Sequence, residues 1–240
     1  MRDRREQIGN SVPSPVVRYY TWASNDKKFR YYGKESGENK HVFPLKVAYL
    51  LDRNTIRGWH DATESSIWSN EVQFTTKEPF NVYSSKPDKK GNTLLATGLY
   101  QDIKGNLGGG HFEKVIYAYE EGVGVVKINL KGSGLASWSS FNKELKKGDL
   151  QNNLLVVTSF ENGKKGATKY TTPTFTLGDA IEAGSDFDKQ VNVAYDGLMD
   201  YIESKNTSKG DDDSEEEQGS GFIDDVEPMK EPVGEDALPF

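Results

Sequence analysis

Tyrosines and lysines alternate with aliphatic residues in the stretch 114–131, which reads KVIYAYEEGVGVVKINLK. In an extended chain, Tyr117 and Tyr119 fall on one face, and Lys127 and Lys131 fall on one face of the next segment. If the two segments pair as an antiparallel hairpin, one side is aliphatic and the other carries rings beside cations. Rings stack on bases and ammonium groups neutralise phosphates, which is the chemistry that a single nucleic-acid strand requires. The alternative is an ordinary half-buried hairpin with amphipathic outer residues.

Three tryptophans offer further stacking surfaces. Trp59 and Trp68 are nine residues apart in a stretch with few aliphatic residues, so each is either a single core residue or a platform for a base. We expect at least one of Trp22, Trp59 and Trp68 to stack. Trp59 ranks first, because Arg57 lies two residues before it and would share its face of a strand.

A third group of candidates is basic. The segment 161–168 reads ENGKKGAT and separates two strand-like runs, so we expect a hairpin whose turn carries Lys164 and Lys165, with Lys169 directly after it. Trp138 and Phe141 recur at helical spacing and are interpreted as core residues.

Strands and helices must position these residues. β-branched and aromatic runs predict strands at 16–22, 29–32, 41–51 (bulged or edged at Pro44), 80–84, 93–103, 112–119, 123–131, 154–160 and 169–177. Helical spacing predicts a short helix near 133–145 and a second within 179–204 that begins near Ser185 or Asp186 and packs on the sheet or on a second subunit. The glycine-rich 104–111 is interpreted as a flexible linker, because no Gly-Lys-Ser/Thr follows and no helix opens there.

This order predicts a mainly β fold: two strands, a helix, then a hairpin resemble an OB-fold, a five-stranded Greek-key barrel, here with extra strands or insertions and a capping helix. The expected domain spans 1–204, with a loose arm at 1–15 and a C-terminal helix at about 180–204. Residues 205–240 form an acidic tail, for which we expect disorder because like charges cannot bury enough apolar surface.

Charge is divided unevenly along the chain. The 240 residues hold 30 basic and 37 acidic side chains, yet residues 205–240 alone hold three lysines and twelve carboxylates, a net charge of −9. Residues 176–204 carry −6, which leaves +8 on residues 1–175. A basic body is the usual electrostatic footprint of a nucleic-acid binder.

The composition also limits the chemistry. The chain has no cysteine, and its three histidines (His41, His60, His111) are far apart. The amino terminus MRDRREQIG lacks the apolar core of a signal peptide and no run approaches ~20 apolar residues, so we expect a soluble, cytoplasmic protein. We find no catalytic motif and expect no metal or cofactor; a nuclease built from scattered carboxylates such as Asp52, Asp61 and Asp102 remains the enzymatic alternative.

The end of the chain is the most specific feature. It reads GEDALPF, with apolar Leu238, Pro239 and Phe240 behind Asp236. This ending, together with KVIYAYEEGVGVVKINLKGSGLASWSSF and GKKGATKYTTPTF in the body, resembles the single-stranded DNA-binding proteins of bacteria and their phages. The body match covers about 65 residues; Leu238 replaces the isoleucine of the family's ending, and Ala237 occupies an acidic position.

The resemblance implies an OB-fold that coats single-stranded DNA without sequence specificity during replication, recombination and repair. It also implies that the tail tip (Asp236, Leu238, Pro239, Phe240) docks on a polymerase, primase, helicase or nuclease. Two other classes stay open: an acidic DNA mimic or histone-chaperone-like protein, against which the positive body argues, and a binder of double-stranded DNA or RNA with the same tail.

Overall fold

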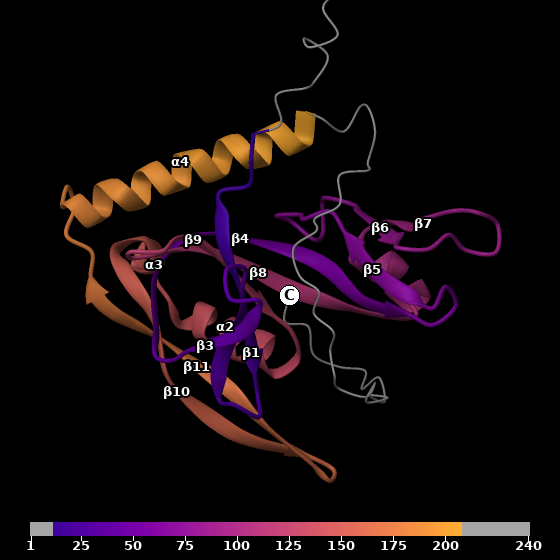
Figure 1. The fold of residues 1–240 in the computed structure, drawn as a ribbon, viewed down its shortest axis with the longest axis horizontal. Coiled ribbons are helices and arrows are strands. Elements are labelled where there is room, and N and C mark those ends of the chain that lie inside the picture. Colours follow the sequence, from indigo (N-terminus) through magenta and orange to yellow (C-terminus); the bar gives the residue numbers. More distant parts are fainter. Residues whose placement is uncertain (1–11, 208–240) are drawn as a thin grey trace, which may run out of the picture.

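The long strand β4 (Leu45–His60) joins the two parts of the fold (Figure 1). The computed structural model describes residues 12–207, with side chains up to Lys205. Strand β8 (Gly109–Glu120) pairs antiparallel along most of β4. On the opposite edge, the first residues of β4 pair with β10 (Asn153–Lys165) and the last four pair with β5 (Ser65–Ser69). The fold is mainly β, as predicted.

The first part is a curved, open sheet packed around one core. Strands β4, β8 and β9 (Gly124–Leu130) form an antiparallel meander, and helices α2 (Gly132–Glu144) and α3 (Asp149–Asn152) lead into β10. β10 then forms a long hairpin with β11 (Thr168–Ala180). Trp138 of α2 is fully buried in this core beside Phe175, which confirms its interpretation as a core residue.

Three N-terminal strands extend this sheet: β1 (Val16–Ala23), β2 (Lys28–Gly33) and β3 (Glu38–Val42). They form an antiparallel meander, and β1 pairs in parallel with β9. The predicted return strand 41–51, with a bulge or edge at Pro44, is in fact divided in two at that residue, and its first residues pair with β2. The chain forms β3 and β4 on either side of Pro44, which cannot donate a backbone hydrogen bond and lies between them.

The second part, which we call the β5–β7 lobe (residues 65–107), contains β5, β6 (Phe80–Ser84), β7 (Leu94–Gly98), α1 (Tyr100–Ile103) and the 3₁₀ turn η2 (Lys104–Asn106). Ile56 of β4, Ile67, Phe80 and Leu107 form its separate core. The predicted strand 93–103 is longer than the observed strand β7. The chain leaves the strand before Tyr100, where α1 begins, and α1 places Ile103 in this core.

The glycine-rich segment 104–111 is not the predicted linker. Its first residues form η2, and Gly109 to His111 begin β8. A Cβ at Gly109 would lie 2.2 Å from the carbonyl oxygen of Trp59, and one at Gly58 would lie 2.7 Å from the carbonyl oxygen of Gly109. The glycines therefore permit the close approach of β4 and β8.

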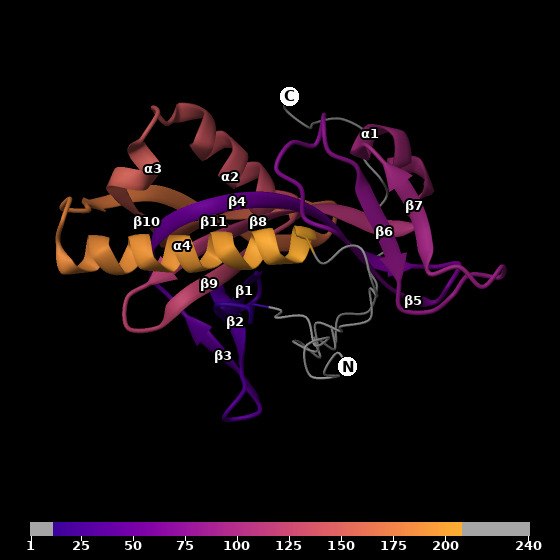
Figure 2. The same ribbon diagram turned by 90° about the horizontal axis from the view of Figure 1, so that it is seen from above.

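Helix α4 (Asp186–Thr207) begins where the sequence predicts. Of the two expected packing partners, the sheet and a second subunit, the sheet of the same chain contacts it. Figure 2 shows it lying along the strands β4, β8 and β9. Leu198 and Tyr201 are buried against residues from β1, β4, β8 and β9, namely Val16, Leu50, Leu51, Val115, Tyr117 and Val125. Helix α4 thus covers part of one outer face of the sheet, over β1, β4, β8 and β9.

Candidate nucleic-acid interface

The uncovered part of the same sheet face carries the exposed tryptophans. Strand alternation and the pairing of Arg57 with Trp68 place Trp59, Arg57 and Trp68 on one face of β4 and β5. The side chains of Trp59 and Trp68 are 54% and 43% exposed. Tyr83 of β6 pairs with Trp68, and their rings stack at a centroid distance of 6.3 Å and an interplanar angle of 25°. These residues form a wide, accessible aromatic surface.

Cations lie beside the rings. Arg57 pairs with His111 of β8, whose Nε2 atom lies 2.9 Å from Oε1 of Glu113. Burial alone would raise the pKa of Glu113, but the hydrogen bond from His111 and the charges of His111, Arg57 and Lys131 hold it below its ordinary value. The carboxylate therefore stays charged and organises the surrounding cations. We call Arg57, Trp59, Trp68, Tyr83 and His111 the aromatic face.

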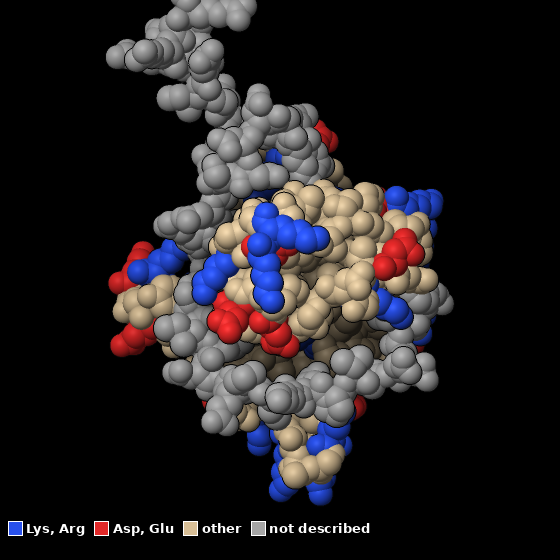
Figure 3. Space-filling view, turned by 90° about the vertical axis from the view of Figure 1, so that its right-hand side faces the viewer, with Lys and Arg blue, Asp and Glu red and all other residues tan. Residues whose placement is uncertain are grey.

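Exposed lysines lie on several elements of the fold. Lys164, Lys165 and Lys169 are exposed on the β10–β11 hairpin, and Lys131 is exposed directly after β9. Lys86, Lys89 and Lys90 are exposed in the β6–β7 connection. In Figure 3, basic side chains gather at the height of this connection and again at the lowest point, where the β10–β11 hairpin ends. The surface below the upper group is hollowed, and acidic side chains as well as basic ones lie beside the hollow.

The prediction that Tyr117, Tyr119 and Lys127 face solvent together is wrong. Tyr117 and Lys127 are only 4% and 3% exposed, because α4 and the β5–β6 connection cover their part of the sheet. Lys127 Nζ lies 2.7 Å from Oε1 of Glu71, and the hydroxyl of Tyr117 donates to Oε2 of Glu71 at 2.8 Å. Tyr119 is half-buried and donates to Gln190 of α4. Of the four residues predicted from this hairpin, Lys131 alone is exposed.

Trp22 also lies elsewhere than predicted. Its ring packs edge-on against Phe29 at 5.1 Å, and its Nε1 atom donates to the carbonyl oxygen of Thr171 at 2.9 Å. The side chain thereby connects β1 to β11 and closes the core of the first part. Trp22 is a packing residue, and its fluorescence would report on folding more than on a bound base.

Tyr83 and His111 are members of the aromatic face that sequence reasoning did not select. Alternation in Phe80–Ser84 could have indicated Tyr83, since Phe80 and Val82 are buried and Asn81 and Tyr83 point to the other side. His111 could not be found in this way. Its place beside Arg57 depends on the pairing of β4 with β8, which are separated by the whole β5–β7 lobe.

The carboxylates considered for a nuclease do not form a metal site. Asp52 binds Lys114 Nζ at 3.3 Å. Within residues 12–205, no three His, Cys, Asp or Glu side chains come close enough together to hold a metal ion. In the same range no helix has the length and apolar character needed to cross a membrane. The proposed tail-tip residues Asp236, Leu238, Pro239 and Phe240 lie outside the described residues.

We compared the chain with protein-family models, with curated proteins and with solved structures, and found no match in any of the three.

Proposed function

We propose that this protein binds and coats single-stranded DNA without sequence specificity, through the aromatic face and the lysines beside it. The observation that carries the proposal is the exposure of Trp59 and Trp68 on one strand face, with Arg57 opposite Trp68 and two residues before Trp59. Each exposed ring offers a stacking surface that tolerates any base, and Arg57, Lys131 and the hairpin lysines supply charge for the phosphates.

The connectivity of the first part supports an OB-type barrel as the scaffold. β4, β8 and β9 form a meander, α2 follows, and the β10–β11 hairpin returns so that β10 pairs with β4. In OB-folds the second and third strands and the loops after the first and fourth strands bind oligonucleotides. By this correspondence, the β5–β7 lobe and the β10–β11 turn occupy the positions of those two loops. The pairing of β1 with the edge of β9 departs from that plan, since among the described strands β11 pairs with β10 alone.

The tail supplies a second part of the proposal. We propose that its tip recruits replication or repair proteins by inserting apolar Phe240 into a pocket while carboxylates pair with basic residues at the rim. Support for this part comes from the sequence alone: the acidic run and the ending EDALPF. No cofactor and no catalytic step enter the proposed function.

Competition decides among nucleic acids. We expect unlabelled oligo(dT) to displace a labelled oligo(dT) better than duplex DNA of equal length, since exposed rings need unpaired bases. A single-stranded RNA competitor of equal length measures the preference between DNA and RNA. Affinity should fall as salt rises, with a log–log slope of roughly −0.7 per neutralised phosphate. Equal competition by duplex, or a flat salt response, would contradict the proposal. Magnesium-dependent loss of the labelled strand would instead support the nuclease.

Substitution of Trp59 tests the site itself. Trp59→Ala should weaken oligo(dT) binding by ~1–3 kcal/mol, as expected for the loss of one stacked base, and leave the thermal midpoint unchanged because the ring is exposed. Fluorescence anisotropy of a labelled oligonucleotide measures the affinity. Tyr195→Ala is the matched control, since Tyr195 is 39% exposed on α4, away from the aromatic face. Unfolding of the Trp59 variant would assign Trp59 to the core.

A further inference from the structure

Strand β2 carries a second set of basic and aromatic side chains. It reads KFRYYG, and Phe29 and Tyr31 pack on the core of the first part. Because successive side chains of a strand alternate, Lys28, Arg30 and Tyr32 lie on the opposite, outer face. Lys28 is exposed, Arg30 is partly exposed, and Tyr32 is 46% exposed. The strand thus presents two cations and one ring on the side away from the core.

Strand pairing places this outer face on the same side of the sheet as the aromatic face. Paired residues of neighbouring strands point to the same side. A continuous row of such pairs crosses the sheet from β2 through β1, β9 and β8 to β4: Arg30, Thr21, Asn129, Val115 and Arg53. Arg53 and Arg57 are four residues apart on β4, an even number, so they share a face. The outer face of β2 therefore continues the surface that carries Arg57.

Lys131 lies between the two sets of residues. It follows Asn129 by two residues with an extended backbone (φ −131°, ψ 165°), so its side chain is also on the outer face, and it is exposed. Burial acts to raise the pKa of Glu113, but its bond to His111 and two nearby cations hold it below its ordinary value. Those cations are Arg57 of the aromatic face and Lys131. Lys131 is therefore the next cation beyond the aromatic face in the direction of β2.

Helix α4 leaves β2 uncovered. Among the described residues, the apolar cluster on which α4 packs contains residues of β1, β4, β8 and β9 and none of β2 or β3. Figure 2 shows β2 and β3 extending beyond the edge of α4. Val115, in the middle of the row of pairs, is fully buried in that cluster. The open route from the aromatic face to β2 therefore runs beside α4, past Lys131.

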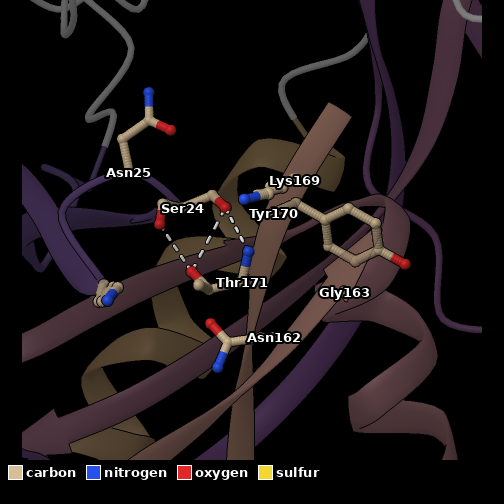
Figure 4. Close-up of a pocket in the computed structure, with 8 residues that line it drawn as sticks. Ser24, Asn25, Asn162, Gly163, Lys169, Tyr170 and Thr171 are labelled. Carbon is tan, nitrogen blue, oxygen red and sulfur yellow. Dashed lines mark hydrogen bonds between the residues drawn. The ribbon is translucent and has the colours of Figure 1, made fainter. Parts of the chain in front are cut away.

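Hydrogen bonds hold the turn that leads into β2. The backbone N–H of Thr171 donates to Oγ of Ser24 at 2.5 Å, and the hydroxyl of Thr171 donates to the carbonyl oxygen of Ser24 at 2.7 Å (Figure 4). The indole of Trp22 donates to the carbonyl oxygen of Thr171. In the turn itself, Asp26 contacts His41 of β3 at 2.9 Å, so its carboxylate is occupied. β2 is thus positioned before any ligand arrives, which lowers the ordering cost of binding.

We propose that the single strand continues from the aromatic face past Lys131 to β2. On β2, Lys28 and Arg30 contact phosphates and the ring of Tyr32 stacks on a base. Such a surface accepts any sequence, because phosphates and base faces are common to all nucleotides. The inference rests on the proposed function and adds to it a strand that lies outside the OB-type plan.

The length of the oligonucleotide tests the path over β2. Oligo(dT) ligands from about 4 to about 16 nucleotides, the range of OB-fold site sizes, are titrated against the full chain and its variants. Tyr32→Leu should weaken binding of the longest ligands by roughly 5- to 150-fold, the loss of one stacked base, and leave the shortest ligands unaffected. Tyr32→Phe should restore binding, because it keeps the ring and loses only the hydroxyl.

A charge variant on the same strand keeps the test valid if Tyr32→Leu does not fold. Lys28→Gln changes an exposed residue and should reduce the magnitude of the log–log salt slope for the longest ligands by roughly 0.7, the contribution of one phosphate. Lys40→Gln is the matched control. Lys40 is exposed on β3, but it pairs with Tyr31 and so lies on the opposite face of the same meander. Its substitution should leave the slope unchanged.

The outcomes separate this path from the proposed function. Wild-type affinity of Tyr32→Leu at every length, equal loss at every length, or equal effects of Lys28→Gln and Lys40→Gln would overturn the path over β2. If Trp59→Ala weakens binding while the β2 variants bind like the wild type, the proposed function stands and the path is wrong. Failure of the wild type to bind any oligo(dT) would instead overturn the proposed function.

Discussion

Residues of one type take different roles in this protein according to their neighbours. Trp22 and Trp59 both lie in strands. Trp22 donates a hydrogen bond to Thr171 and packs on Phe29, whereas Trp59 is exposed to solvent and has two glycines as neighbours. Lys127 and Lys131 are four residues apart, yet Lys127 is buried in an ion pair with Glu71, whereas Lys131 is exposed. Residue type suggests the chemistry that is available; packing decides whether that chemistry reaches a ligand.

The ion pair of Lys127 with Glu71 should therefore contribute to stability and not to DNA binding. Glu71→Gln leaves the Lys127 ammonium buried without its counter-charge, so the free energy of unfolding should fall by about 3 kcal/mol at pH 7. Urea denaturation measures this value. Glu121→Gln, in the exposed β8–β9 turn, is the control and should leave stability unchanged.

The pH dependence of this effect has a definite sign. Burial would raise the pKa of Glu71, but Lys127 and the Tyr117 hydroxyl hold it below the ordinary value of 4.5. A carboxyl group whose pKa is lowered on folding stabilises the protein above its unfolded pKa and loses that contribution as the pH falls through its folded pKa. The difference between wild type and Glu71→Gln should therefore shrink below pH 4.5. A difference that grows in acid would contradict the assignment.

At the scale of elements, the β10–β11 hairpin should act as a phosphate contact. Changing Lys164 and Lys165 together to alanine should weaken oligo(dT) binding at low salt and reduce the magnitude of the log–log salt slope by about one to two. Salt titrations monitored by anisotropy give the slope. Lys146 and Lys147, another exposed adjacent pair, provide a charge-matched control between α2 and α3. If both pairs changed the slope equally, the charge would act through the whole body and not through a site.

The hydrophobic periodicity of the sequence predicts many of the strands and helices, but it does not predict how they pack on one another. The periods of 2 and 3.6 in the sequence predict β1, β2, β6, α2 and α4 at or near their observed bounds. Alternation also correctly predicts that Arg57 and Trp59 share a face. It identifies which residues share a face but not what packs on that face, so the cover of α4 over Tyr117 and Lys127 could not be predicted.

Long-range pairing escapes prediction for a similar reason. The extension of β4 to sixteen residues depends on β8, β10 and β5, which come from three distant parts of the chain. The parallel pairing of β1 with β9 joins segments about a hundred residues apart, and no local signal marks it.

At the scale of the whole molecule, charge separates the body from the end of the chain. Residues 1–175 carry a net charge of +8, and lysines are exposed in the β6–β7 connection, directly after β9 and on the β10–β11 hairpin. Residues 209–240 hold two lysines and twelve carboxylates, a net charge of −10. A tethered polyanion of this kind and a phosphate backbone are attracted by the same cations.

Removal of residues 209–240 should accordingly leave oligo(dT) binding intact or tighten it, with the larger gain at low salt where charges are least screened. Deletion of Phe240 alone removes no acidic side chain, so it should barely change the affinity for oligo(dT) while abolishing recruitment of a replication protein through the tip. Anisotropy titrations and pull-downs with the intact, truncated and Phe240-deleted chains measure the two activities side by side. Equal loss of both activities on truncation would mean that the tail is part of the DNA site. A tail that only competes with DNA for the lysines cannot be required for DNA binding.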